Sequence, residues 1–334
     1  MPPTAIGHHH RSRRWAGLAA LLAAALVAGG WMVTQRNGAT SPPLVQAYAQ
    51  EALKALDRGY YAQGEAWDEA RQKLQGAAGP AEVESELHEE IRAATTAAGG
   101  THSRFYTRAQ VEDLKASSQE RYRAPTVDTK DGITTVTVPP LGVVPLEQQQ
   151  EYARTLADGI DVAAPGTCGW VVDLRGNTGG NMYPMLSGLV ALLPNGPAMS
   201  FRDRQGSSSV VTVHQDGVGL GETQVSVGER QKVASLPVAV LQDKTTGSSG
   251  EAVVTVFRGL PHVESFGSST AGLTSGNEPF FLADGAVINL TTSVYVDRND
   301  VNLAEQPIPA DHRMVPTTAA ESAQRWIEQG GCTG

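Results

Sequence analysis

Ser248 lies where a buried strand is expected to turn into a helix. The run VAVL at 238–241 is short and apolar, a turn containing glycine follows, and 250–257 has the composition of a packed helix. A hydroxyl at such a turn lies beside the unpaired N–H groups of the helix N-terminus, which could stabilise an oxyanion. The position therefore suits a nucleophile. Ser248 and Glu251 also form the S-x-x-E pattern of a helix capping box, so a purely structural role stays open.

A glycine-rich loop is the expected source of further oxyanion donors. The sequence DLRGNTGG at 173–180 ends a near-continuous apolar strand, 169–174. Gly179 and Gly180 let backbone N–H groups point inward without a Cβ in the way, and the N–H of Ser249 would be the second donor. An ordinary glycine turn between a strand and a helix would look the same. The loop lacks the Lys-Ser/Thr ending of a P-loop.

The general base is expected to be a histidine or a lysine. His102 follows a Gly-Gly break, in the loop that joins an N-terminal helical region to the core, where clefts commonly form. Lys244 lies four residues before Ser248, at the end of a strand, where we expect it to point to solvent. The helical residue His88 is expected to be solvated. The other histidines beyond the N-terminal region lie in or next to predicted strands: His214, His262 and His312.

Alternating strands and helices must position these residues. Strands and helices alternate through 130–270, which predicts an α/β core. The preceding helical region cannot bury all its apolar faces by itself, so we expect it to pack as a cap on that core. The predicted organisation is a helical cap at 44–125 and an α/β core at 126–334. The helices expected at the start of the cap are 44–58, 60–75 and 81–98.

The first 43 residues form a separate region. Basic residues precede a mostly apolar run at 15–33, and such a helix spans about 28 Å, close to the thickness of the hydrocarbon core. The positive-inside rule leaves 1–14 in the cytoplasm and exports the rest, with 34–43 as a linker. A cleaved signal peptide is the alternative, but the length of the run and the lack of a clean A-x-A site favour one transmembrane signal-anchor. We therefore expect a single-pass cell-membrane protein with an extracytoplasmic domain, or a secreted one if the segment is cleaved.

Composition excludes several classes of partner. The net charge of −9 and the absence of a basic stripe interleaved with aromatics argue against nucleic acid. The sequence has no CxxC pair and no H-E-x-x-H, so neither a metal nor another cofactor is expected. Cys168 and Cys332 could form a disulfide outside the cytoplasm. Sequence does not give the distance between them, so their pairing stays open.

An ordered set of motifs resembles the C-terminal processing (tail-specific) serine peptidase family. The set is DLRGNTGG, TTGSSGE, FGSSTAGLTSGN, LADGAVINLTTSVYVDRND and IPADH, and the resemblance covers about residues 100–315. It implies an α/β core related to the crotonase and Clp-protease architecture. In that family the nucleophile lies three residues before the glutamate of the strand-to-helix turn. The resemblance therefore implies Ser248, not Ser249, as the nucleophile.

Within that family the sequence resembles the histidine-using branch. The lysine-using branch has its lysine just after a G-x-x-T-x-G loop, which here is Gly267–Gly272, and the next residue is Leu273. The branch typified by tricorn protease and the nisin resistance protein takes a histidine from the N-terminal helical part, where His102 stands. The resemblance thus implies a Ser248–His102 dyad. Tricorn-type enzymes add a glutamate from the C-terminal region, and Glu305 lies at about the corresponding place.

These residues predict a membrane-anchored serine endopeptidase that cleaves peptide or protein substrates near their C-terminus, outside the cytoplasm. The resemblance suggests lantibiotic-like peptides as substrates. The alternative is a catalytically inactive peptide-binding module on the same fold, which the missing lysine invites and His102 opposes. A crotonase-like acyl-CoA enzyme is disfavoured, because such enzymes are intracellular and the N-terminal helix exports this domain.

Overall fold

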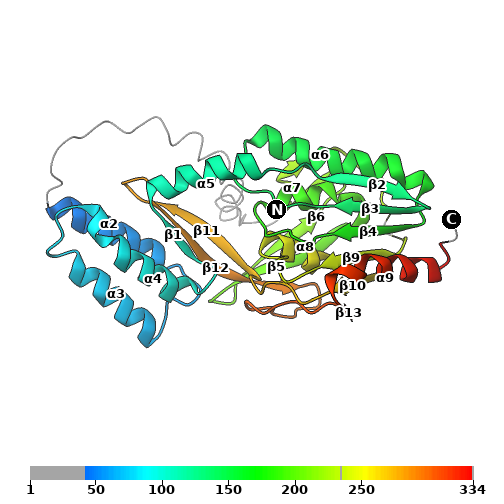
Figure 1. Cartoon of the computed structure of the whole chain (residues 1–334). Coiled ribbons are helices and arrows are strands. Elements are labelled where there is room, and N and C mark those ends of the chain that lie inside the picture. Colours follow the sequence, from blue (N-terminus) through cyan, green and yellow to red (C-terminus); the bar gives the residue numbers. More distant parts are fainter. Residues whose placement is uncertain (1–41, 234, 333–334) are drawn as a thin grey trace, which may run out of the picture.

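The computed structural model describes residues 42–233 and 235–332. The molecule is elongated, with a helical bundle at one end and a layered α/β body at the other (Figure 1). Two long strands, β11 (Ser275–Phe281) and β12 (Val287–Asp297), run between these ends. The predicted membrane segment at 15–33 lies outside the described residues, and none of the helices within them is long and apolar enough to cross a bilayer.

One sheet is mostly parallel and carries the two loops that the sequence singled out. Its strand order is β13-β10-β9-β4-β3-β2, and every neighbouring pair is parallel except β2 with β3. Parallel strands end at the same edge of a sheet, so the loops after adjacent strands β4 and β9 meet there. Those loops are the glycine-rich loop and the turn at Ser248. The strands are β2 (Thr126–Lys130), β3 (Ile133–Thr137), β4 (Gly169–Asp173), β9 (Val238–Gln242), β10 (Val263–Gly267) and β13 (His312–Arg313).

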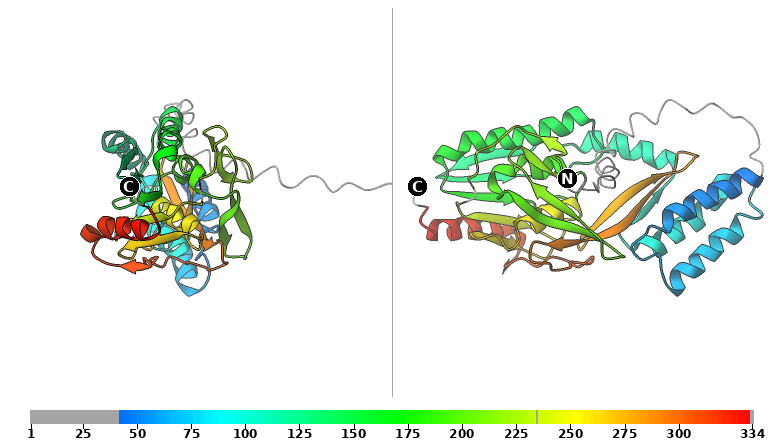
Figure 2. Two further views of the ribbon diagram at one scale, coloured as in Figure 1. Left: turned by 90° about the vertical axis from the view of Figure 1, so that its right-hand side faces the viewer. Right: turned by 180° about the vertical axis from the view of Figure 1, so that it is seen from behind.

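Helices cover both faces of this sheet, which explains its continuous apolar strands. Along β4, Trp170 and Val172 belong to the apolar core that also contains residues of α6, α7 and α8, whereas Val171 packs with α9 on the other face. The prediction of an α/β core is confirmed, including a helix directly after Ser248. Figure 2 shows the sheet between these helices from two further sides. The helices are α6 (Leu146–Ala163), α7 (Met182–Gly188), α8 (Ser249–Phe257) and α9 (Pro316–Gln329), with 3-10 turns at Ala164–Gly166 and Val190–Leu192.

A second, antiparallel sheet joins the body to the helical bundle. Its strand order is β1-β12-β5-β6-β7-β8, and β11 also pairs with β12. No sequence pattern predicted β11, whose sequence SGNEPFF contains a glycine and a proline. Such a segment owes its strand conformation to its partner rather than to its own propensity. The remaining strands are β1 (Arg104–Tyr106), β5 (Gly196–Asp203), β6 (Ser208–Val213), β7 (Gly217–Leu220) and β8 (Val225–Ser226).

The helical bundle shares its apolar core with the second sheet. Phe105 on β1 and Ile288 and Leu290 on β12 are buried in one cluster with side chains of the bundle. The helical region therefore packs on the sheet, as expected from its surplus of apolar faces. The boundary between cap and core at residue 125 stays a prediction. The helices of this part are α2 (Pro42–Leu56), α3 (Glu65–Ala77), the 3-10 turn η3 (Glu84–Leu87), α4 (His88–Gly99) and α5 (Arg108–Arg121).

Three sequence-based expectations for this region were wrong. The helix predicted at 81–98 is divided, since α4 begins at His88 after the 3-10 turn at Glu84–Leu87. The helix predicted at 60–75 begins only at Glu65, because Gly64 has a φ of 78° and residues 60–64 form an irregular connection. His88, predicted to be solvated, is partly buried, and its Nε2 lies 2.9 Å from Asp284 Oδ2. The pattern of helix α4 alone could not show that the turn between β11 and β12 would cover that side chain.

The two cysteines are paired. Cys168, just before β4, is joined to Cys332, just after α9, with a Cα–Cα distance of 5.3 Å. This disulfide fastens the C-terminal helix α9 to the sheet that it covers and closes a loop across 164 positions of sequence.

Candidate active site

Ser248 sits at the turn between β9 and α8 in an unusual backbone conformation. Its φ is 51° and its ψ is −116°, and a non-glycine residue with positive φ is uncommon. Such conformations persist where the surrounding structure enforces them, and they cluster at functional sites. Ser248 is partly buried and lines the cleft described below.

The side chain of Glu251 holds this turn through hydrogen bonds. Its carboxylate accepts hydrogen bonds from the N–H of Ser248 at 2.9 Å, the N–H groups of Gly272 and Leu273 at 2.7 Å, and the hydroxyl of Thr270 at 2.5 Å. The side chain is fully buried, and burial raises its pKa although these hydrogen bonds act in the opposite direction. Both halves of the predicted capping box are therefore present, because the Ser248 side chain also accepts from the N–H of Glu251. They do not exclude a chemical role, because the Ser248 side chain still lines the cleft.

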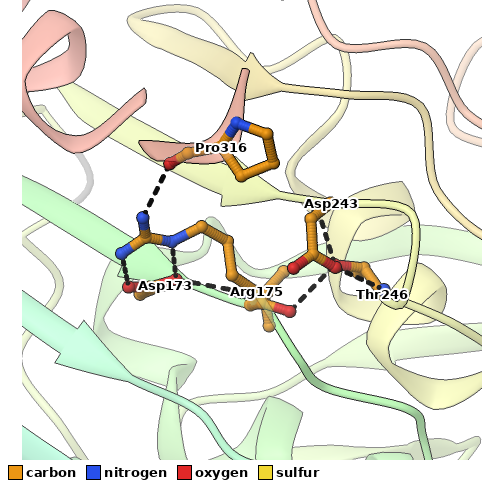
Figure 3. Close-up of polar contacts among 6 residues, drawn as sticks. Asp173, Arg175, Asp243, Thr246 and Pro316 are labelled. Atoms are coloured by element: carbon orange, nitrogen blue, oxygen red, sulfur yellow. Dashed lines mark hydrogen bonds and ion pairs between the residues drawn. The ribbon is translucent and has the colours of Figure 1, made fainter. Parts of the chain in front are cut away.

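Figure 3 shows how the loops after β4 and β9 are braced. Arg175 donates to Asp173 Oδ2 at 2.5 Å and to the carbonyl of Pro316, the first residue of α9, at 3.0 Å. Asp243 accepts from the N–H of Thr246 at 3.0 Å and also from the backbone of Gly176 in the neighbouring loop. Burial opposes ionisation of Asp243, but these bonds outweigh burial and lower its pKa. The two loops are therefore held in a fixed relation.

The glycine-rich loop approaches the Ser248 turn closely. A Cβ placed on Gly179 would lie 2.8 Å from the Ser248 Cβ and 3.1 Å from the Ser249 nitrogen. The N–H of Gly179 already donates to Asn177 Oδ1 at 2.9 Å. The carbonyl of Gly179 accepts from Leu141 N–H at 3.1 Å. Since N–H and C=O point opposite ways in a trans peptide, this bond directs the N–H of Gly180 away from Leu141.

The Ser249 hydroxyl and the backbone N–H groups beside it differ in whether they already have a hydrogen-bond partner. The Ser249 hydroxyl donates to the Gly180 carbonyl at 2.5 Å, so it is occupied. By contrast, the described part of the chain offers no hydrogen-bond acceptor to the N–H groups of Gly180 and Ser249. Both residues line the same cleft as Ser248. The occupied Ser249 hydroxyl favours Ser248 as the nucleophile, and the engaged N–H of Gly179 favours Gly180 as a free backbone donor.

His102 lies between α4 and β1 and lines the same cleft. Its Nδ1 is 2.8 Å from Ser275 Oγ, and its carbonyl accepts a hydrogen bond from Asn277 Nδ2 at 3.1 Å. Burial, with the charge of Arg104, lowers the pKa of His102 to about 4. The imidazole is therefore neutral at neutral pH, the state in which it can accept a proton.

Glu305 reaches His102 through one intervening hydroxyl. Ser275 Oγ donates to Glu305 Oε1 at 3.2 Å, and the Tyr61 hydroxyl donates to Glu305 Oε2 at 3.0 Å. Sequence reasoning included Glu305 but missed Ser275 and Tyr61. Ser275 stands in the motif FGSSTAGLTSGN, which was used for its position in the chain and not for a side chain. Tyr61 had no signal, since it was assigned to a helix.

A cleft of about 1080 Å³ brings these groups together. Its wall contains Ser248, Gly180, His102 and Ser275, and it continues past Arg204 towards the helical bundle. Among the described residues, Ser248 and His102 share no hydrogen bond, and in enzymes without substrate such contacts are often long.

The lysine alternatives do not reach this cleft. Lys244 is exposed and is not part of the wall. Leu273, at the position expected for the lysine of the other branch, donates its N–H to Glu251, and its Cδ1 would lie 3.5 Å from a Cβ on Gly247. An aliphatic side chain therefore stands beside the Ser248 turn where a lysine base would be needed. Within the described ranges, no cluster of His, Cys, Asp and Glu could hold a metal ion.

Comparison with known proteins assigns the class to which this fold and site belong. Residues 140–314 match the model of peptidase family S41. The nisin-resistance protein of Lactococcus lactis subsp. lactis is 31% identical over 288 residues, which cover 86% of this chain and 88% of that protein. The chain therefore belongs to peptidase family S41, and it is a serine peptidase.

Solved structures agree with this fold. A lipoprotein from Streptococcus agalactiae superposes with a TM-score of 0.76 at 25% identity, covering 89% of this chain and 99% of that chain. The photosystem II D1 C-terminal processing protease has a TM-score of 0.57 at 15% identity, covering 85% of this chain and 97% of that chain. The second comparison shows a shared fold.

Proposed function

We propose that this chain is an extracytoplasmic serine endopeptidase that cuts peptides near their C-terminus with a Ser248–His102 dyad. The carrying observation is that Ser248, in a strained turn, and a neutral His102 line one cleft, while Leu273 stands where the other branch has its lysine. His102 takes the Ser248 proton as Oγ attacks the scissile carbonyl, and then gives it to the leaving amine.

The oxyanion that forms in this step is bound by backbone N–H groups. Ser249 and Gly180 supply them, because both N–H groups are unengaged and both residues line the cleft. Gly179, whose N–H is held by Asn177, supports the loop instead. Removal of one such donor from other enzymes costs roughly 100- to 1,000-fold in rate. Glu305 orients the base from the far side of Ser275.

The proposed location is the outer face of the cell membrane, with the segment at 15–33 as the anchor. Three observations support it. The first is the basic cluster before the apolar run in the sequence. The second is the Cys168–Cys332 disulfide, which belongs to oxidising compartments. The third is that one of the similar solved structures is described as a lipoprotein. Fractionation of expressing cells, with a protease added outside intact cells, tests this location.

The proposed substrates are lantibiotic-like peptides, by similarity to the nisin-resistance protein. The test is to incubate nisin with the full chain in detergent and to follow the products by mass spectrometry. One cut near the C-terminus, absent with Ser248→Ala, is expected. Cleavage that persists in Ser248→Ala would contradict the proposed nucleophile.

The second candidate function is a catalytically inactive peptide-binding module. It is favoured by the absence of a lysine after the Gly267–Gly272 loop. The same incubation separates the two functions, because a binding module would retain intact nisin on the protein and release no fragments.

A further inference from the structure

We infer that Ser275 and Tyr61 are positioning residues that, with Glu305, fix His102 in the tautomer needed for general-base catalysis. The inference rests on the proposed dyad and extends it beyond a histidine and a glutamate. No proton moves along this chain of groups in the proposed role. It holds the Nδ1–H of His102 in place and leaves Nε2 free to accept the proton of Ser248.

The direction of the hydrogen bonds follows from the count of protons. An ionised carboxylate only accepts, so Ser275, which has one proton, donates it to Glu305 Oε1 at 3.2 Å. The Ser275 oxygen can then only accept from His102 Nδ1, at 2.8 Å, which places the imidazole proton on Nδ1. Ser275 is only 1% exposed, so bulk water does not compete for this oxygen.

Tyr61 holds the second oxygen of Glu305. Its hydroxyl donates to Oε2 at 3.0 Å, and burial, followed by the charge of Glu305, raises the pKa of Tyr61, so it remains a donor. Gly100 allows this approach: a Cβ there would meet the Tyr61 ring at 2.7 Å and Glu305 Oε2 at 3.0 Å. Tyr61 thus connects the helical bundle to the base.

The turn that carries Tyr61 is itself clasped by the body of the molecule. Arg204, between β5 and β6, donates to the backbone carbonyls of Asp57, Gly59 and Ala62. The N–H of Tyr61 donates to the carbonyl of Ala98 at 2.8 Å, at the end of α4. A turn held from both sides can place a hydroxyl with the accuracy that orientation of a base requires.

The test combines a tautomer measurement with reaction rates. In the full chain in detergent, ¹⁵N NMR of the imidazole reports which nitrogen of His102 carries the proton, and this needs no turnover. The second-order rate of labelling by a fluorophosphonate reports nucleophile activation. The variants are Ser275→Ala, the conservative Ser275→Thr and Tyr61→Phe. The matched control is Tyr60→Phe, which removes a hydroxyl from the neighbouring ring of the same turn.

We expect the Nδ1–H tautomer in the wild type and a mixture of tautomers in Ser275→Ala. Loss of orientation there should slow labelling about 100-fold, and Ser275→Thr should restore much of the rate. Tyr61→Phe should slow labelling about tenfold, the value of one hydrogen bond to a charged group, while Tyr60→Phe labels like the wild type.

Two results would overturn the inference. One is the Nε2–H tautomer in the wild type at neutral pH. The other is a Ser275→Ala protein, folded by circular dichroism, whose tautomer and labelling rate both match the wild type. If Ser248→Ala and His102→Ala abolish labelling while Ser275→Ala and Tyr61→Phe do not, the dyad stands and the positioning role fails. If the wild type does not label but Ser275→Ala changes the tautomer, Ser275 does orient His102 and the proposed dyad fails.

Discussion

At the scale of residues, the candidate site combines a histidine whose pKa is lowered and a serine whose backbone has a positive φ. Burial keeps His102 neutral, and the positive φ of Ser248 keeps its side chain at the cleft. Two pieces of chain that are 146 positions apart therefore place a neutral imidazole and a hydroxyl on the wall of one cleft. Their chemistry makes two predictions at this scale.

The pH dependence should report the low pKa of His102. A protonated imidazole cannot accept the Ser248 proton, so activity should be present above a pH of about 4 and be lost as the pH falls through about 4. The measurement is the labelling rate of the free protein between about pH 3 and 8, with circular dichroism as the check on folding. An acid limb near the ordinary histidine pKa of about 6.5 would contradict the burial described for His102.

Gly179→Ala should disable the nucleophile although it replaces no proposed catalytic group. The new Cβ would lie 2.8 Å from the Ser248 Cβ, at a φ of 107° that suits glycine. We expect labelling to fall by about 100-fold or more, since a displacement near 1 Å can cost that much. Gly176→Ala is the matched control, because it also has a positive φ but nothing within 4 Å of the added Cβ. Equal rates for the two variants would rule out the close approach as the cause.

At the scale of elements, adjacent parallel strands bring two loops together, and two carboxylates, one fully and one partly buried, hold them by hydrogen bonds. Asp243 ties the Ser248 turn to the glycine-rich loop, and Glu251 ties it to the segment that contains Leu273. The Ser248 turn is therefore held from two sides by hydrogen bonds to ionisable groups.

Glu251→Gln should destabilise the protein and slow labelling together. An amide offers one oxygen and one NH₂ to the four donors that the carboxylate satisfies, so buried N–H groups lose their acceptor. We expect a loss of about 1–3 kcal/mol in the free energy of unfolding, measured by urea denaturation. Glu321→Gln on α9, which breaks only an exposed pair with Arg325, is the control and should cost under about 1 kcal/mol. If Glu251→Gln changes neither the free energy of unfolding nor the labelling rate, the hydrogen bonds of Glu251 do not hold the Ser248 turn.

How far the sequence predicts the structure also depends on the element. The parallel strands and helix α8 were predictable, since buried β4 and β9 are short apolar runs bounded by glycine or polar turns. Strand β11 was not, because its conformation comes from pairing with β12. Ser275 and Tyr61 were missed for the same reason, as only the assembled sheet and bundle bring them to Glu305.

At the scale of the whole molecule, the helical bundle and the α/β body share one cleft. On the wall of this cleft, His102 comes from the bundle side, and Ser248 and Gly180 follow strands of the parallel sheet. Tyr61, also from the bundle side, donates to Glu305. The long strands β11 and β12 connect the two ends (Figure 1). Activity should therefore depend on how the helical bundle packs against the α/β body, and not only on the residues that each part supplies.

The Cys168–Cys332 disulfide should stabilise the body without being needed for chemistry. It closes a long loop, so its loss should lower the free energy of unfolding by about 2–5 kcal/mol. Denaturant unfolding of Cys332→Ser and of the double variant Cys168→Ser/Cys332→Ser measures this loss, and labelling should continue in both while they remain folded. Equal stability of wild type and double variant would contradict the expected contribution.

The most direct test of the account is fluorophosphonate labelling of the full chain beside Ser248→Ala and His102→Ala. The account predicts that the wild type labels on Ser248, and that both variants lose labelling while they remain folded by circular dichroism. Labelling that survives in His102→Ala would place the base elsewhere, and a wild type that never labels would favour the peptide-binding module.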